Sequence, residues 1–188
     1  MTATVETTKG RALILRTCDK NGLSSGGFQW PKSGHVEAPD WKPTRECGNG
    51  LHGALWGEGD GSLLSFGRDA VWIVAEVSEW IDLDGKVKFP SANVLHYGDR
   101  QTATDFIAAN GAIGAVIGGT ATAGYRGTAT AGDGGTATAG YGGMICIKWH
   151  DGKRYRISVG YVGERGIKPN IAYRCVSGSF VPVDGETP

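Results

Sequence analysis

The chain has 188 residues, and its 19 basic and 19 acidic side chains give a formal net charge of zero. This balance argues against a dedicated nucleic-acid binder, whose affinity comes mainly from neutralising phosphates. No apolar run approaches the roughly 20 residues that span a bilayer, and residues 1–11 show no signal-peptide pattern, so we expect an intracellular protein without a membrane partner. Glycine is over-represented: it accounts for 32 of the 188 residues, against a usual share of about 7%. This excess indicates a segment whose conformation depends on backbone freedom more than on side chains.

The N-terminal segment, residues 1–111, is expected to be a β-rich α+β region. Apolar runs predict strands at residues 11–16 and 71–77, and residues 21–62, rich in Gly, Pro, Ser and Trp, are expected to form an irregular loop. Residues 81–89 predict a hairpin that turns at Asp84-Gly85, followed by a strand at residues 91–96. Asp99 is expected to cap a helix that runs to about Asn110, with Gly111 at its end.

The glycine excess comes from an eight-residue repeat. Octads begin at Gly119, Gly127 and Gly135, and each contains Thr-Ala-Thr-Ala. In an extended strand the threonines share one face and the alanines the other, while glycines supply the turns. Because tyrosine returns only after sixteen residues, at Tyr125 and Tyr141, the sequence predicts a short β-solenoid with one strand per octad and about sixteen residues per coil.

The alanine column has apolar neighbours at both ends of the repeat. Ile113 and Ala115 stand one octad before the first alanine pair, and Ile145 and Ile147 stand one octad after the last. We therefore expect the inward column to extend over residues 112–147, and we expect the flanks to cap this solenoid, because three octads alone do not bury a core.

The C-terminal segment, residues 148–188, is expected to complete a β-hairpin cap. Met144 to Trp149 and Lys153 to Tyr161 predict a hairpin around Asp151-Gly152, and short strands are expected near residues 172–175 and 179–183. The predicted fold is therefore mainly β: a short β-solenoid capped by β-rich α+β flanks with one helix.

Two resemblances accompany these patterns. The octads, from Gly119 to Gly143, resemble the repeats of bacterial ice-nucleation proteins, which implies a β-solenoid with a tyrosine ladder at Tyr125 and Tyr141 and threonine rows on flat faces. The flanks resemble uncharacterised phage and prophage proteins, through residues 27–34, the Cys47 to His52 motif and the segments 167–173 and 180–183. The second resemblance implies no activity, but it places the expected protein in the cytoplasm of a bacterial host.

The threonine rows are the candidate repeat face. Threonines two residues apart on neighbouring strands form a regular lattice of hydroxyl and methyl groups that can order water at ice-like spacing. The alternative is that a solenoid face simply needs β-branched, water-compatible residues. The residues of this face are Thr120, Thr122, Thr128, Thr130, Thr136 and Thr138.

Cys47 and His52 are the candidates for a metal or catalytic site. A thiolate and an imidazole five positions apart in a glycine-rich turn could reach one zinc ion, with Cys18, His35 or Cys175 completing the ligands, or could act as nucleophile and base. No second compact pair accompanies them, and a buried cysteine beside a backbone-bonded histidine is the competing interpretation. We expect no cofactor, reduced thiols and no enzymatic activity.

Charge is divided unevenly along the chain. Residues 1–111 carry 11 basic and 14 acidic side chains, whereas residues 144–188 carry 7 basic and 4 acidic ones. Cations and aromatics gather on the C-terminal hairpin, which could contact an acidic protein or nucleic acid, or could be a solvated edge. The candidate partner-binding residues are Tyr125, Arg126, Tyr141, Lys148, Trp149, Lys153, Arg154, Tyr155 and Arg156.

The leading functional hypothesis is a non-enzymatic, phage- or prophage-encoded protein that binds a macromolecular partner through its rigid solenoid and basic hairpin. Inhibition of a host defence complex is one version of it, and the repeat edge at Tyr125 and Arg126 also suggests a homodimer. The alternatives are an ice-binding or virion-associated structural protein, and a zinc-dependent or thiol enzyme that uses Cys47 and His52.

Overall fold

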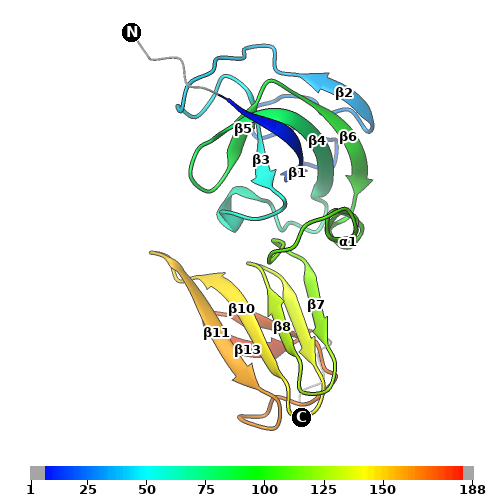
Figure 1. Ribbon diagram of the computed structural model, residues 1–188, viewed down its shortest axis with the longest axis vertical. Helices are drawn as coiled ribbons and strands as arrows, with labels where there is room; N and C mark the ends of the chain where they lie inside the picture. The colour runs from blue at the N-terminus through cyan, green and yellow to red at the C-terminus, as the bar shows by residue number, and fades with distance from the viewer. Residues whose placement is uncertain (1–6, 184–188) are drawn as a thin grey trace. The chain divides into compact units, whose positions relative to one another are not determined.

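The computed structural model describes residues 7–183. The chain divides into two compact units, Met1–Gly114 and Ala115–Pro188. Strands dominate both units, and the described residues contain one α-helix (Figure 1). The predicted mainly β class with one helix is therefore confirmed. The repeat and the C-terminal segment, which the sequence predicts as separate parts, lie together in the second unit.

The first unit is built on a sheet of six strands in the order β1-β3-β5-β4-β6-β2 (Figure 1). The two longest strands, β1 and β4, pair antiparallel from Thr8↔Trp80 to Cys18↔Val71. Both predicted N-terminal strands are thus confirmed, and they hold the most apolar runs because they lie in the sheet interior. The bounds are β1 Thr8–Cys18, β2 Gly34–Glu37, β3 Leu51–Leu55, β4 Val71–Asp82, β5 Val87–Phe89 and β6 Ser91–Gly98.

The hairpin and the helix that follow the central strand form as predicted. Asp84 and Gly85 take positive φ angles of 61° and 103°, and β5 returns along β4. The helix α1 spans Arg100–Ala109, and the carboxylate of Asp99 accepts a hydrogen bond of 2.9 Å from the backbone N–H of Thr102. Since that carboxylate satisfies a donor that the first turn leaves unpaired, it fixes where the helix begins.

The expectation of an irregular loop across residues 21–62 is wrong in part. The segment contains β2, which pairs with β6, β3, which pairs with β1 and β5, and a short 3₁₀ helix, η1, at Gly61–Leu63. Both strands are short, and glycines interrupt their apolar pattern. At Gly53 in β3, an added Cβ would lie 2.9 Å from Ile14 Cδ1, so this position of the strand requires glycine. That glycine is one reason why the sequence of β3 resembles a loop.

The repeat in the second unit forms three strands, β7 Thr120–Ala123, β8 Thr128–Ala131 and β9 Thr136–Ala139. β7 pairs parallel with β9 from Thr120↔Thr136 to Ala123↔Ala139, an offset of sixteen residues. β8 pairs parallel, at the same offset, with β10, which spans Met144–His150. One strand per octad and a sixteen-residue register are therefore confirmed.

Alanines face the interior of this unit, as predicted. Ala129, Ala131, Ala137 and Ala139 are buried, and Ile145 and Ile147 continue the column, since Ile145 pairs with Ala129 and Ile147 with Ala131. The predicted extension before the repeat is wrong. Ile113 is fully exposed and Ala115 half-buried, and neither lies in a strand. The apolar side chains buried in this segment are instead those of Val116 and Ile117.

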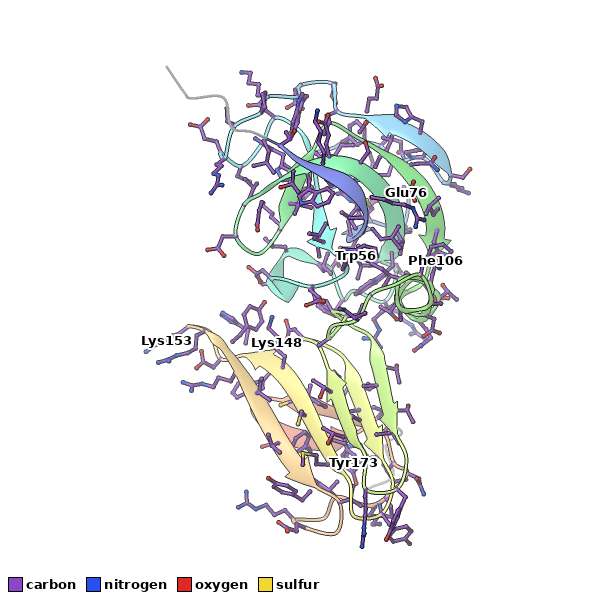
Figure 2. All side chains as sticks on the ribbon, viewed as in Figure 1. Trp56, Glu76, Phe106, Lys148, Lys153 and Tyr173 are labelled. Carbon is purple, nitrogen blue, oxygen red and sulfur yellow. The ribbon has the colours of Figure 1, made fainter. Side chains whose placement is uncertain are left out.

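Two hairpins complete the second unit. β11 Tyr155–Tyr161 pairs antiparallel with β10, and β12 Tyr173–Val176 pairs with both β13 Ser179–Pro182 and β9. The resulting sheets have the orders β11-β10-β8 and β13-β12-β9-β7 (Figure 1). Tyr173, labelled in Figure 2, is buried in the same hydrophobic cluster as the alanine column, and Ile167 and Phe180 pack there too. The predicted C-terminal strands are confirmed. One of them, β12, pairs with β9, the strand of the last octad.

Candidate functional sites

Four threonines form one ordered patch on the sheet that contains β7 and β9, here called the threonine face: Thr120, Thr122, Thr136 and Thr138. The register places Thr120 beside Thr136 and Thr122 beside Thr138. The Thr136 hydroxyl donates a hydrogen bond of 3.2 Å to that of Thr120. Strand geometry spaces such a patch at roughly 4.8 Å across the strands and 6.7 Å along them.

The threonine face ends at a charged residue on one side and at the edge of the sheet on the other. The next strand, β12, places Arg174 opposite Thr136, so a cation ends the row of hydroxyls. On the other side β7 is the edge of its sheet. The face is thus two strands wide.

The remaining threonines stand on the other sheet and do not form a comparable patch. Thr128 and Thr130 are exposed on β8, but their neighbours on β10 are Met144 and Cys146. The six threonines of the candidate repeat face therefore divide into four on one sheet and two on the other, as one strand per octad and a sixteen-residue repeat predict, because successive octads alternate between the sheets.

Tyr125, Arg126 and Tyr141 lie at two turns of the second unit, sixteen residues apart. The Arg126 backbone N–H donates to the Tyr141 carbonyl at 2.9 Å, and the Arg126 guanidinium lies 5.1 Å from the Tyr125 ring centre. Both tyrosine side chains are exposed, at 70% and 67%. The two corners are therefore adjacent, as the predicted ladder requires, and their aromatic rings face solvent in this unit.

The six hairpin residues predicted as a partner-binding patch are distributed over different faces. Alternation along β10 and β11 puts Lys148 and Tyr155 on one face, with the Lys148 Nζ 4.1 Å from the Tyr155 ring centre. Trp149 and Arg156 pair on the opposite face. Figure 2 shows Lys148 on β10 and Lys153 in the turn between β10 and β11.

Two of these six residues, Trp149 and Arg156, make contacts within the second unit. The Trp149 Nε1 donates to Ser158 at 3.0 Å, and a Cβ at Gly178 would lie 2.9 Å from the Trp149 ring. Arg156 pairs with Asp151. Hydrogen bonds from the backbone N–H groups of Arg154 and Lys153, and then from Arg156, lower the pKa of Asp151 to about 2. Fewer of these side chains are left for a partner than the sequence suggests.

Cys47 and His52 both line one cavity of the first unit. The Cys47 thiol is exposed and accepts a hydrogen bond of 3.0 Å from Lys86 Nζ, which lowers its pKa. Burial, assisted by the nearby cations Lys86 and Arg16, lowers the pKa of His52 to about 4. His52 is therefore a neutral imidazole at pH 7.

The predicted zinc ligands are not assembled. Cys18 is buried at the end of β1, and His35 bonds Glu37 at 3.0 Å. Among residues 7–183 no group of three or more His, Cys, Asp or Glu side chains is arranged to hold a metal ion. The observed neighbour of the Cys47 thiol is the Lys86 ammonium, and this contact favours the thiolate form of the cysteine.

The cavity has a volume of about 720 Å³ and contains functional groups that no motif in the sequence marks. Arg16, from the end of β1, stacks over Trp30 at 4.2 Å and donates from Nη1 to the His52 carbonyl at 3.1 Å. The only sign of this site in the sequence is a charged residue, Arg16, directly after the apolar run of β1. The role of Arg16 depends on its contact with Trp30, fourteen residues later in the chain.

Comparison with known proteins finds one family model and a set of similar curated proteins. Residues 12–109 match the family model described as "Domain of unknown function (DUF7666)". An ice nucleation protein of Pseudomonas syringae is 49% identical over 109 residues, covering 56% of this chain and 10% of the relative. InaU of Pantoea ananas is 48% identical over 101 residues, covering 52% and 10%. One from Xanthomonas campestris pv. translucens is 47% identical over 104 residues, covering 53% and 7%.

These findings change several expectations. The resemblance to ice-nucleation repeats is confirmed, whereas the absence of enzymatic activity stays a prediction. The predicted cytoplasmic location is wrong, because ice nucleation proteins are bacterial surface proteins. No helix within the described range 7–183 has the length and apolar character needed to cross a bilayer. The phage or prophage origin stays a prediction.

The chain spans about a tenth of the length of the ice nucleation proteins that it matches. No solved structure matches it. The family model runs from within β1 to the end of α1, which is most of the described first unit. By that match, the chain belongs to the family of the domain of unknown function DUF7666.

Proposed function

We propose that the second unit is a short β-solenoid that binds ice through the threonine face. The observation that carries the proposal is the alignment of Thr120 with Thr136 and of Thr122 with Thr138 on adjacent parallel strands. Parallel pairing at a sixteen-residue offset supports the solenoid, and the similarity to ice nucleation proteins supports the ligand. The ice-related reading is therefore preferred over an inhibitor of a host defence complex.

The size of the face decides which activity to expect. Four threonines on two strands offer a small lattice, and the chain spans only about a tenth of the length of the ice nucleation proteins it matches. A small ordered patch can attach to ice that already exists. We therefore propose ice binding, measured as thermal hysteresis and inhibited recrystallisation, as the activity of this chain.

Matched variants on the two sheets test the proposal. Thr122 on β7 and Thr130 on β8 are both exposed and stand on edge strands of their respective sheets. Thr122→Tyr is expected to abolish thermal hysteresis, because the bulky ring breaks the flat lattice, whereas Thr130→Tyr is expected to retain it. Absence of hysteresis in the unaltered protein, or equal loss in both variants, would contradict the proposal.

A second candidate function is binding of a protein partner through β11. Its outward residues Ile157, Val159 and Tyr161 are 67%, 47% and 50% exposed, which forms an apolar row on a sheet face. Exposed apolar patches mark interaction sites. Val159→Lys would abolish a partner interaction without changing thermal hysteresis, so the two candidates can be measured separately.

A further inference from the structure

The cavity of the first unit contains hydrogen-bonding atoms without partners. Three side-chain nitrogens that belong to cavity-lining residues are shielded from solvent and make no hydrogen bond within residues 7–183: Arg16 Nε, Trp30 Nε1 and His52 Nε2. Buried polar atoms are nearly always paired, so three in one place require an explanation. Two of them, Arg16 Nε and Trp30 Nε1, can only donate. The missing groups are therefore acceptors.

The charge on Arg16 is also not neutralised. The three salt bridges among the described residues do not include it, and its guanidinium contacts the Trp30 ring, the His52 carbonyl and, by a side-chain hydrogen bond, Cys18. The titratable group beside it is Cys18, whose pKa burial raises, so that thiol is uncharged at pH 7. A cation in this setting favours an anion in the adjacent space.

The acidic residues of the cavity do not supply that anion. Asp40 accepts a hydrogen bond of 3.1 Å from Asn49 Nδ2, and Asp60 accepts from the Ser62 backbone N–H at 2.9 Å and from its hydroxyl at 2.6 Å. Lys86, the second cation of the lining, contacts the Cys47 thiol. These contacts engage other residues of the chain, and none of the three salt bridges among the described residues joins a carboxylate of the cavity to Arg16.

We propose that this cavity binds a small molecule through an anionic oxygen group, a phosphate or a carboxylate, that accepts hydrogen bonds from Arg16 and Trp30. The volume of about 720 Å³ lies within the range of small-molecule sites and accommodates a nucleotide-sized ligand. Phe28, which packs edge-on to Trp30 with ring centres 6.1 Å apart, supplies apolar lining. This site is independent of the threonine face, since it lies wholly in the first unit.

The experiment uses the full chain with three probes: inorganic phosphate, adenosine monophosphate and citrate, each compared with sodium chloride of equal ionic strength. Calorimetric titration is expected to detect at least one of the three. Binding of the phosphate compounds alone identifies a phosphate ligand, and binding of citrate alone identifies a carboxylate ligand. Failure of all three probes overturns the proposal.

Two variants on the same strand separate the site from general charge effects. Arg16→Met removes the cavity cation and is expected to weaken binding about tenfold or more, the factor that the loss of a charge-assisted hydrogen bond implies. Arg11→Met removes an exposed guanidinium that pairs with Glu76, and it is expected to leave affinity unchanged. Equal affinity of wild type and Arg16→Met overturns the proposal.

A second measurement does not depend on the folding of any variant. Cys47 lines the cavity, whereas Cys146 belongs to the second unit. A bound anion is expected to slow the alkylation of Cys47 by iodoacetamide in the wild-type protein, while the alkylation of Cys146 keeps its rate. Equal slowing at both cysteines, or no slowing at Cys47, overturns the placement of the ligand in this cavity.

Discussion

The hydroxyl of Thr136 donates a hydrogen bond to the hydroxyl of Thr120, sixteen residues earlier in the chain. The same two residues are partners in the parallel ladder of β7 and β9. A repeat of eight residues therefore produces contacts at sixteen, because successive octads go to opposite sheets. This alternation leaves a face of four threonines on one sheet and only two threonines on the other.

The alanine column sets the thickness of the second unit. Ala129 is 2% exposed and pairs with Ile145 on β10. Ala129→Leu is expected to lower the free energy of unfolding by about 1–3 kcal/mol, because added methylenes force the two layers apart. Urea unfolding measures the change. Thr130→Leu, one residue later on the outward face, is the control, and an equal effect of both substitutions would count against inward-facing alanines.

His52 makes the stability of the first unit depend on pH. Its pKa is about 4 in the folded chain against an ordinary value of 6.5, so between these two values the unfolded chain binds more protons. Stability is expected to be fully present above pH 6.5 and to fall as the pH drops toward 4. Urea unfolding at a series of pH values measures this slope. His52→Gln is expected to flatten the slope, and an unchanged slope in that variant would disprove the assignment.

The contact between Lys86 and Cys47 controls the reactivity of the thiol. The hydrogen bond from the Lys86 ammonium lowers the Cys47 pKa, so alkylation of Cys47 is expected to be half-maximal below the ordinary thiol pKa of about 8.5. Lys86→Met is expected to move this midpoint upward and to slow alkylation at pH 7. The pH–rate profile followed by mass spectrometry is the measurement. Lys20→Met, an exposed lysine of the same unit, should leave the profile where it is.

The Asp99 carboxylate anchors the start of α1. Its pKa is lowered, first by the hydrogen bond from the Thr102 backbone N–H, which shows that the charged form makes the contact. Asp99→Ala is expected to lower the free energy of unfolding by about 1 kcal/mol. Thermal or urea unfolding of the full chain reports it. Asp105→Ala, within the same helix, removes a carboxylate that caps nothing, and a loss as large as that of Asp99→Ala would refute the capping role.

Local chemistry made much of the fold predictable. Alternation of threonine and alanine predicts strands, Asp84-Gly85 predicts a reversal, and Asp99 predicts the beginning of a helix, because each depends on residues close in sequence. β2 and β3 were missed for the converse reason. Gly53 lies in β3 because Ile14 occupies the space where a side chain would stand, and that neighbour is 39 positions away in the sequence.

The candidate sites show the same division. The spacing of Cys47 and His52 in the sequence predicts a candidate site. The residue that lowers the pKa of the Cys47 thiol is Lys86, and the residue that places an unpaired charge at the cavity is Arg16. Neither stands near the motif in sequence. The sequence shows the basic and aromatic residues of the hairpin as one cluster. In the structure, the alternation of side chains along the strands places Lys148 and Tyr155 on one face and Trp149 and Arg156 on the other.

By itself the sequence determined the period of eight, the inward alanines and the glycine turns, because a strand's alternation and a turn's φ angles are properties of neighbouring residues. Only the tertiary structure decided that Arg174 stands beside Thr136, that Ile113 stands outside the alanine column, and that Arg16 lies over Trp30. These relationships depend on which strands pair and on what fills the space beside them. Pairing and packing join residues far apart in the chain, and no local pattern encodes them.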